Sequence, residues 1–469
     1  MNFNSLQYLL FLPVVVILYY LLPRRLKDPM LLVASYYFYM CWQPVYAVLM
    51  LFSTAVTWLS GLAMDRCPGK KRLWLVLSLL INLAILFVFK YFNFFSHTLA
   101  SLFGRQGPTL NVLLPVGISF YTFQALGYSI DVYRGGLPAE KSFLNYALFV
   151  SFFPQLVAGP IERADNILPQ LKRPRPFRWE NIQAGILPIL WGQFKKVVIA
   201  DNLAVLVNTA YGDVAAASGA QLFFATGCFA FQIYCDFSAY SDIARGSAKL
   251  LGIDLMQNFN APYAADSVRD FWRRWHISLS GWFRDYLYFP LGGSRVPRWR
   301  HCLNVLIVFL VSGLWHGAAM TYVIWGLLHG LFQMVEILAQ KNGPRKPASA
   351  PVRLCRILWT FALVCFAWIF FRAASLSDAV VTIQRIFTSF GRPGSVLLLG
   401  LSKSALCSTF LAVVLLALVD FNGADNVLAR ISQSGAWRFV AYYGLCMAIF
   451  LFGYYGAGYN PQDFIYFQF

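Results

Sequence analysis

Apolar runs alternate with short basic segments along almost the whole chain. The first run covers residues 6–22 and ends at Pro23, Arg24 and Arg25. About 20 consecutive apolar residues are enough to cross the hydrocarbon core of a bilayer as a helix. Because such runs recur from end to end, the pattern predicts an all-α integral membrane protein with about 11 to 12 spans plus re-entrant segments.

The expected spans share this length and composition, and they cover residues 6–22, 30–46, 48–64, 73–95, 110–130, 182–211, 221–240, 304–339, 358–371, 396–419 and 439–455. The run at 304–339 is too long for one span, and Gly317 is the expected dividing point. The run at 143–157 is too short and has basic residues on both sides, so we expect it to enter the membrane and return. Residues 259–293, rich in Arg and Trp, suit short helices at the cytoplasmic face.

Basic loops orient these helices. The loops at Arg24, Arg66 and Arg134 are expected in the cytoplasm, because loops that carry Lys and Arg tend to stay on that side. The N-terminus and the tail at 456–469 are then expected outside. The first run has no basic residue before it and no small-residue cleavage site after it, so we interpret it as a retained helix and not as a signal peptide.

The composition agrees with solvation by lipid, since 59% of the residues are hydrophobic and only 12% are charged. The net charge of +18 would suggest nucleic acid in a soluble protein. Here the Lys and Arg mostly separate apolar runs, so we expect membrane lipids as partners and no nucleic acid. Part of the charge could serve an anionic cofactor at the cytoplasmic face. The nine Cys include no CxxC pair, so the sequence predicts no metal site and no disulfide framework.

The segment from Asn258 to Gly330 contains the imidazoles least expected in a membrane. His316 lies in an almost wholly apolar run, one turn after Ser312 and between glycines that would let a ligand approach the backbone. Burial keeps an imidazole neutral, and only the neutral form can accept a proton. His316 is therefore a candidate general base for a hydroxyl nucleophile, with core packing as the alternative. His329 would lie about 220° further around an unbroken helix, so we expect it to face away and pack.

His276 follows Arg273 and Arg274 and precedes Ser280 by one turn. A segment rich in Arg and Trp is usually an interfacial anchor. His and Ser on one face beside Arg could also hold an anionic substrate, because guanidinium groups bind anions strongly. Both interpretations stay open from these residues alone.

Two carboxylates, Asp236 and Asp242, lie in or beside apolar sequence. Such carboxylates usually face a cavity or pair with a base. Pairing with Arg245 or Arg273 is one explanation, and catalysis is the other. No GxSxG elbow, P-loop or metal-ligand cluster is present, so the sequence favours group transfer from an anionic donor over phosphoryl transfer or redox chemistry.

Four motifs together resemble the bacterial branch of the membrane-bound O-acyltransferases: VAGPIER (157–163), IYCDFSAYSD (233–242), RRWHISLSGWFRDYLYFPLGG (273–293) and SGLWHG (312–317). The similarity runs over most of the chain. It is strongest to the alginate O-acetyltransferase group and its peptidoglycan and cellulose acetylation relatives, with the teichoic-acid D-alanylation proteins more distant.

The resemblance implies a helical bundle around a central funnel, with His316 as the catalytic His and His276 as a second polar residue of the active site. It implies acetyl-CoA as the acetyl donor and no permanently bound cofactor. The acetyl group would cross the bacterial inner membrane to a periplasmic acetyltransferase partner that acts on polysaccharide. On this basis the chain divides into N-terminal transmembrane helices (1–142), a catalytic core (143–340), C-terminal transmembrane helices (341–455) and an external aromatic tail (456–469).

Two further predictions concern the substrate path. Arg269, Arg273, Arg274 and Arg284 could bind the phosphates of CoA, with lipid anchoring as the alternative. In the tail, Tyr466 carries a phenol that a neutral His could deprotonate. The tail also resembles the short C-terminal aromatic motif of this family's acetylation proteins, in which the tyrosine looks like an acyl relay. Packing in a groove on the outer face is the alternative.

Two functions of other classes compete with the enzyme. One is a transporter or channel that moves an acyl compound or a lipid without chemistry, although the chain shows no convincing internal repeat of the kind many transporters have. The other is a scaffold of a polysaccharide export or modification complex. A scaffold should tolerate the loss of His276 and His316, whereas the enzyme should not.

Overall fold

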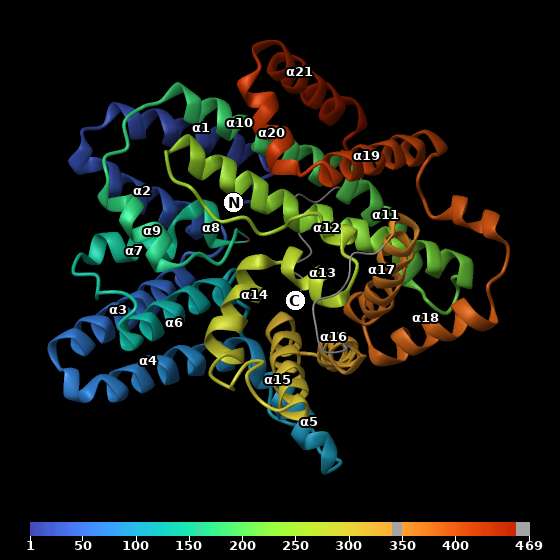
Figure 1. Cartoon of the computed structure of the whole chain (residues 1–469), viewed down its shortest axis with the longest axis horizontal. Coiled ribbons are helices and arrows are strands. Elements are labelled where there is room, and N and C mark those ends of the chain that lie inside the picture. The colour runs from blue at the N-terminus through green and yellow to red at the C-terminus, as the bar shows by residue number, and fades with distance from the viewer. Residues whose placement is uncertain (158, 340–348, 456–469) are drawn as a thin grey trace. The chain divides into compact units, whose positions relative to one another are not determined.

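The computed structural model describes residues 1–157, 159–339 and 349–455, and these residues form helices and loops without a strand (Figure 1). By packing they separate into two compact units. Unit 1 comprises the described residues of 1–189 and 240–256, and unit 2 comprises those of 190–239 and 257–469. Two of the three boundaries fall inside helices, α10 (Trp179–Phe194) and α12 (Gly219–Leu250), and the third falls in the loop after α12. The four sequence-based segments have different bounds and remain predictions.

Unit 1 begins with long apolar helices and continues with short ones. Before α10 they are α1 Leu6–Leu21, α2 Arg24–Met40, α3 Val45–Arg66, η1 Pro68–Lys70, α4 Lys71–Leu86, η2 Phe87–Tyr91, α5 Phe92–Leu102, α6 Ile118–Arg134, α7 Phe143–Ser151, α8 Phe153–Leu156 and α9 Ala164–Lys172. Helices α3, α4 and α6 lie side by side (Figure 1). Most of α6 is buried, which explains why this span of only 17 residues carries polar side chains such as Gln124.

The segment expected to be re-entrant forms two short buried helices. Helix α7 ends at Ser151, Phe152 leaves the helical conformation with ψ 112°, and α8 has only four residues. Neither helix is long enough to cross a hydrocarbon core of about 30 Å. The break therefore agrees with a segment that does not span, and its entry into the membrane stays a prediction.

Unit 2 contains the remaining helices. They are η3 Lys195–Ala200, α11 Asp201–Gly212, η4 Pro262–Ala264, α13 Val268–Arg274, α14 Ile277–Phe283, η5 Arg284–Tyr288, α15 Arg298–His316, α16 Met320–Ala339, α17 Ala350–Arg372, α18 Leu376–Thr388, η6 Pro393–Leu398, α19 Lys403–Phe421, α20 Ala424–Gln433 and α21 Gly435–Phe452. The short helices expected within 259–293 are present, and the long run divides directly after His316, next to Gly317.

Two expectations about unit 2 change. The span expected at 182–211 stays helical from α10 through α11 but contains a π-helical turn, η3, where Lys195 and Lys196 interrupt the apolar sequence. Helices α18 and α20 were not predicted. Both are amphipathic, with apolar positions spaced among polar ones, so a search for continuous apolar runs does not find them.

Within the described residues, seven helices are long and apolar enough to cross a membrane. They are Val45–Arg66, Pro68–Leu102, Gly219–Leu250, Met320–Ala339, Ala350–Arg372, Lys403–Phe421 and Gly435–Phe452. The count is lower than 11 to 12 because other apolar stretches, such as α1 with 16 residues and α6 with 17, form shorter helices.

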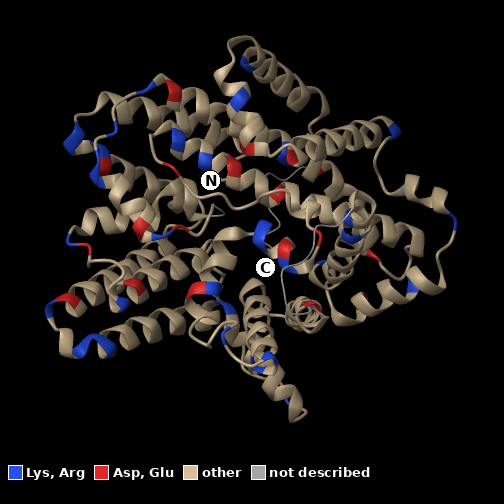
Figure 2. Cartoon of the chain, in the orientation of Figure 1, with Lys and Arg blue, Asp and Glu red and all other residues tan. Residues whose placement is uncertain are grey.

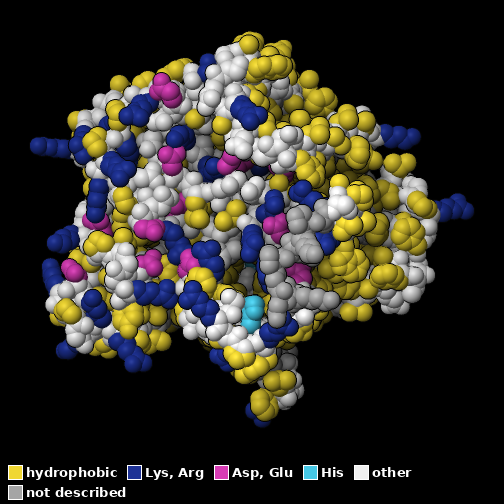
Figure 3. Space-filling model, viewed as in Figure 1, with side chains coloured by type: hydrophobic (Ala, Val, Ile, Leu, Met, Phe, Trp, Pro, Cys, Tyr) yellow, Lys and Arg dark blue, Asp and Glu magenta, His cyan; other side chains and the backbone are white. Residues whose placement is uncertain are grey.

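The surface of these helices fits lipid as the solvent. Charged residues gather near helix ends and in loops (Figure 2). Hydrophobic side chains cover α19 and α21 (Figure 3), where Phe410 is 66% exposed and Phe450 is 75% exposed. Helix faces with such exposed apolar side chains are unfavourable in water. The protein is therefore an all-α, multi-pass membrane protein, as the sequence predicted.

Candidate functional site

His276 lies at the junction between α13 and α14, in a left-handed conformation with φ +45°. Among the described residues, Ala261 is the one other non-glycine residue with a positive φ. Such a conformation is strained and persists where neighbouring groups hold it, often at functional sites. Here two backbone hydrogen bonds hold the junction: the Ile277 N–H donates to the Asn258 carbonyl and the Asn260 N–H donates to the Arg274 carbonyl, both at 2.9 Å.

The side chain of Asn258 determines the chemical form of this imidazole. Its Oδ1 accepts hydrogen bonds from the backbone N–H of Ser278 at 3.2 Å and from the Ser278 hydroxyl at 2.9 Å. The same oxygen lies 3.2 Å from Nδ1 of His276. Because an amide oxygen only accepts, Nδ1 must carry the hydrogen, and Nε2 is then the basic nitrogen. Burial lowers the pKa of His276 to about 3, so the ring is neutral.

Sequence reasoning expected Ser280 to stand beside this imidazole. Instead the Ser280 N–H donates to the His276 carbonyl at 2.9 Å, and its hydroxyl donates to the Trp275 carbonyl at 3.3 Å. Ser280 thus supports the backbone of α14, and Asn258 reaches the ring. Asn258 was given no role in the sequence analysis, because a partner 18 residues away leaves no periodic signal.

His316 is the last residue of α15 and is 3% exposed. Its ring centroid lies 6.3 Å from that of His276. Aromatic rings enclose it, with centroid distances of 5.0 Å to Trp315, 5.0 Å to Trp325 and 5.7 Å to Phe371. Helices α15, α16 and α17 therefore build an aromatic pocket around one imidazole and bring it next to the other.

The glycines around His316 serve helix packing. A Cβ atom on Gly313 would overlap the carbonyl of Tyr322, and one on Gly326 would overlap the carbonyl of Phe309. The absence of side chains at these two positions lets α15 and α16 cross closely. This corrects the expectation that the glycines flanking Trp315 and His316 admit a ligand, because Tyr322 of α16 occupies the space beside both Gly313 and Gly317.

His329 packs away from the pair. It accepts a hydrogen bond at Nδ1 from the indole N–H of Trp272 at 3.2 Å. The ring of Trp325 lies 5.0 Å from His329 and 5.0 Å from His316. His329 is a packing residue as expected, although the helix breaks between the two histidines and Trp325, not helical rotation, keeps them apart.

A buried ionic network lies on η3, α11 and α12. Lys196 Nζ lies 2.8 Å from Asp201 and 2.8 Å from Asp236, and Lys195 Nζ donates to the Ser238 hydroxyl at 2.7 Å. Lys196 is therefore a basic partner of Asp236 that the sequence analysis did not name, since it suggested Arg245 or Arg273. Buried charges are stable only when paired and hydrogen-bonded, which this arrangement provides. Phe237, next along α12, packs against the His276 ring with centroids 4.7 Å apart.

The four candidate arginines lie on α13 and η5, close in sequence to His276. Arg274 pairs with Asp270 at 2.8 Å, the expected i,i+4 pair, and Arg284 pairs with Asp285 at 2.8 Å. Arg273 and Arg284 are exposed, whereas Arg269 and Arg274 are half-buried. These pairings do not show what the four arginines bind, so their role remains a prediction. Tyr466 lies outside the described residues.

Comparison with known proteins decides the family. Residues 136–377 match the model of the MBOAT, membrane-bound O-acyltransferase family, and this range includes Asn258, His276 and His316. The chain belongs to the membrane-bound O-acyltransferase family. It is therefore a membrane-bound acyltransferase, and the resemblance in its motifs is confirmed.

Individual relatives of this acyltransferase cover most of its length. It is 39% identical to the probable alginate O-acetylase AlgI of Pseudomonas aeruginosa over 83% of this chain and 75% of that protein. It is 37% identical to the peptidoglycan O-acetyltransferase of Helicobacter pylori over 80% of this chain and 77% of that protein. The teichoic acid D-alanyltransferase of Bacillus subtilis is 28% identical over 61% of this chain and 74% of that protein.

Proposed function

We propose that this acyltransferase takes an acetyl group from cytoplasmic acetyl-CoA and passes it across the bacterial inner membrane for O-acetylation of an extracytoplasmic polysaccharide. The observation that carries the proposal is the pair of buried imidazoles of His276 and His316, with ring centroids 6.3 Å apart. Relatives named for alginate and peptidoglycan acetylation support acetyl as the group and a glycan as the final acceptor.

The reaction needs one base that removes the proton of a hydroxyl group as the hydroxyl oxygen attacks a thioester. His316 takes the proton of the hydroxyl as its oxygen bonds to the acetyl carbon, and the C–S bond of acetyl-CoA breaks. The proton then passes to the CoA thiolate, so no charge is left in the membrane. His276, held neutral by burial with Nδ1–H directed to Asn258, presents Nε2 as an acceptor that orients the hydroxyl. Acetyl-CoA is a substrate, and no permanently bound cofactor is required.

The arginines of α13 and η5 fit the anionic end of this donor. Arg273 is exposed and can bind phosphate, whereas Arg274 is partly neutralised by Asp270 and Arg284 by Asp285. Replacing Arg273 with Gln should raise the KM for acetyl-CoA with little change in kcat. Loss of membrane insertion without a change in KM would assign these residues to lipid anchoring.

For the outward step we propose that the phenol of Tyr466 accepts the acetyl group and a periplasmic acetyltransferase then moves it to the polysaccharide. A phenyl ester keeps enough transfer potential for this second step. Tyr466→Phe retains the ring and removes the nucleophile, so it should abolish polymer acetylation. Full acetylation by this variant would show that acetyl reaches the partner by another route. In this scheme both chain termini face the periplasm.

The direct test is the transfer of labelled acetyl from acetyl-CoA by purified protein. His316→Ala should lower the rate by about 10²–10⁴-fold, the usual contribution of a positioned base. His97→Ala, which removes an exposed imidazole from α5, is the matched control and should act like the wild type. Retained transfer in His316→Ala at equal protein level would overturn His316 as the base, whereas no transfer by the wild type would favour a scaffold or a transporter.

A further inference from the structure

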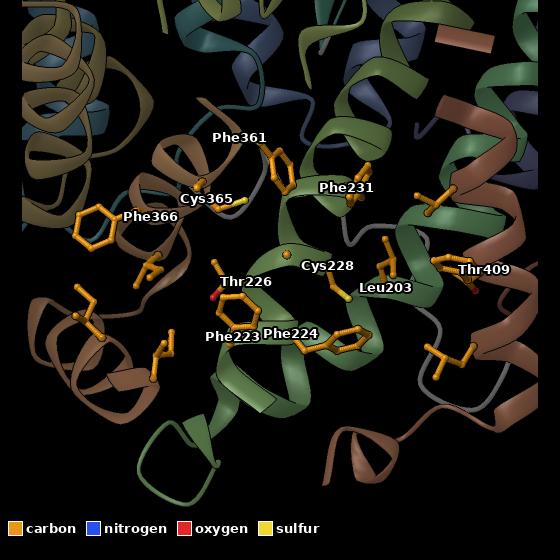
Figure 4. A pocket seen from close by; sticks show the side chains of 18 of the residues that line it. Leu203, Phe223, Phe224, Thr226, Cys228, Phe231, Phe361, Cys365, Phe366 and Thr409 are labelled. Atoms are coloured by element: carbon orange, nitrogen blue, oxygen red, sulfur yellow. The ribbon is translucent and has the colours of Figure 1, made fainter. Parts of the chain in front are cut away.

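Unit 2 contains an apolar cavity of about 550 Å³. Five helices line it, namely α11, α12, α17, α18 and α19 (Figure 4). Its walls are mainly phenylalanine, isoleucine and leucine side chains, with Thr226, Thr409, Cys228 and Cys365 among them. None of the described residues that line it is charged, and neither His276 nor His316 is among them.

The cavity lies at the depth of the hydrocarbon. Helices α12, α17 and α19 are three of the seven that are long and apolar enough to cross a membrane. Their lining residues lie inside these helices, at 223–231 in the first half of α12, 361–369 in the second half of α17 and 406–413 in the first half of α19. A cavity whose lining is almost wholly apolar holds little water, but it does accept apolar molecules. At this depth the apolar molecules available are the acyl chains of the bilayer.

The rim leads to the lipid-facing surface. Phe223 is 61% exposed, Phe387 is 79% exposed and Phe410 is 66% exposed, and all three also line the cavity. The amphipathic helix α18 turns Ile383, Ile386 and Phe387 toward the cavity, which is the i, i+3, i+4 spacing of one helix face. An acyl chain could therefore enter from the membrane without passing a polar barrier.

We propose that this cavity binds one acyl chain of a membrane phospholipid as a structural ligand. The chain would brace α17, whose cavity side presents Cys365 and Ile369 and whose other side carries Trp368 and Phe371. Phe371 belongs to the aromatic pocket of His316, so the lipid supports the wall of the active site without taking part in the reaction. The proposal does not depend on which acyl group the enzyme transfers.

The test uses a phospholipid with a photoreactive diazirine within one acyl chain, incorporated into nanodiscs with the full-length protein. After irradiation, mass spectrometry should find label on the cavity segments at 223–231 and 361–369, beyond the label on lipid-facing residues of α21. Gly227 lines the cavity, and a Cβ atom there meets no atom within 4 Å. Gly227→Leu should therefore fill the space and reduce cavity labelling severalfold.

Gly444→Leu on α21 is the matched control, since a Cβ atom at Gly444 also has open space. It should leave cavity labelling unchanged. Removal of lipid by detergent should lower the Tm of the wild type and of Gly444→Leu more than that of Gly227→Leu, because leucine replaces the acyl chain. If Gly227→Leu does not fold, Cys365→Leu fills the same space from α17. Equal labelling in filled and unfilled variants, or label confined to the exposed faces, would overturn the proposal.

Discussion

The imidazole of His276 takes its chemical form from one amide. Oδ1 of Asn258 accepts a hydrogen bond from Nδ1–H of His276 and so keeps the hydrogen on that nitrogen. Burial lowers the pKa of the imidazole to about 3, so the ring is uncharged. A neutral ring with a defined tautomer can accept a proton or a hydrogen bond at Nε2 alone. The structure thus adds Asn258 to the residues that prepare the site.

Replacing Asn258 with Asp should change the pH dependence of the enzyme. The new carboxylate would favour the imidazolium form of His276 and raise its pKa, because an opposite charge at hydrogen-bond distance stabilises the charged state. The acid limb of the pH profile of kcat/KM should therefore move to higher pH. Ser278→Ala removes a donor to Asn258 without adding charge, so its acid limb should stay in place. An unshifted limb in Asn258→Asp would mean that His276 does not titrate in the reaction.

Glu162, in unit 1, is a second residue whose burial has a measurable consequence. It is 1% exposed and accepts hydrogen bonds from the Asn166 amide at 2.7 Å and from the Met256 N–H at 2.5 Å. Burial raises its pKa from 4.5 to about 7 despite these bonds. The folded protein therefore binds a proton at Glu162 more tightly than the unfolded chain does.

This raised pKa predicts that the proton on Glu162 stabilises the fold fully below pH 4.5 and that the stabilisation is lost as the pH rises toward about 7. The loss is on the order of 3 kcal/mol, since each pKa unit corresponds to about 1.4 kcal/mol. Glu162→Gln keeps an acceptor and cannot ionise, so its Tm should fall less than that of the wild type between these two pH values. Parallel Tm curves for the two proteins would contradict the prediction.

At the scale of elements, α16 holds α13 in place through two polar contacts on one face. Glu336 accepts hydrogen bonds from the N–H groups of Val268 and Arg269, at 2.6 and 3.2 Å. Two turns earlier, His329 accepts from the indole of Trp272. Helix α13 has only seven residues and ends just before the strained His276, so its position depends on these contacts and not on its own length.

Glu336→Ala should therefore reduce catalysis by displacing His276. We expect kcat to fall about tenfold or more, because displacements near 1 Å cost this much in active sites. The KM for acetyl-CoA should rise as well, because α13 also carries Arg273. Glu336→Gln keeps an acceptor and should recover part of the rate, and Glu180→Ala, at an exposed position, should act like the wild type. A KM effect alone, or no rescue by Gln, would contradict a positioning role.

At the scale of the whole molecule, the basic loops predict how the chain is threaded through the membrane. The segment at 66–72 should face the cytoplasm, because it carries Arg66, Lys70, Lys71 and Arg72. Alkaline phosphatase fused after residue 105 should be active, and green fluorescent protein fused after residue 69 should fluoresce. The opposite pattern would show that the chain has the reverse orientation in the membrane, which would contradict the proposed cytoplasmic side for acetyl-CoA.

The sequence alone determined the features that depend on local pattern. Apolar runs predicted an all-α membrane protein, and Gly317 marked the break between α15 and α16. The motifs around His276 and His316 identified the family. These predictions succeeded because solvation by lipid and helix breaking act on neighbouring residues, and a long motif retains its spacing along the chain.

Tertiary structure alone decided which distant residues meet. It paired Asp236 with Lys196 across elements and placed Asn258 against His276. It also gave Gly313 a packing role and left a cavity between five helices. None of these has a sequence signature, because burial and hydrogen-bond partners follow from how helices cross. The positions of the amphipathic helices α18 and α20 likewise depend on the surface against which their apolar faces pack.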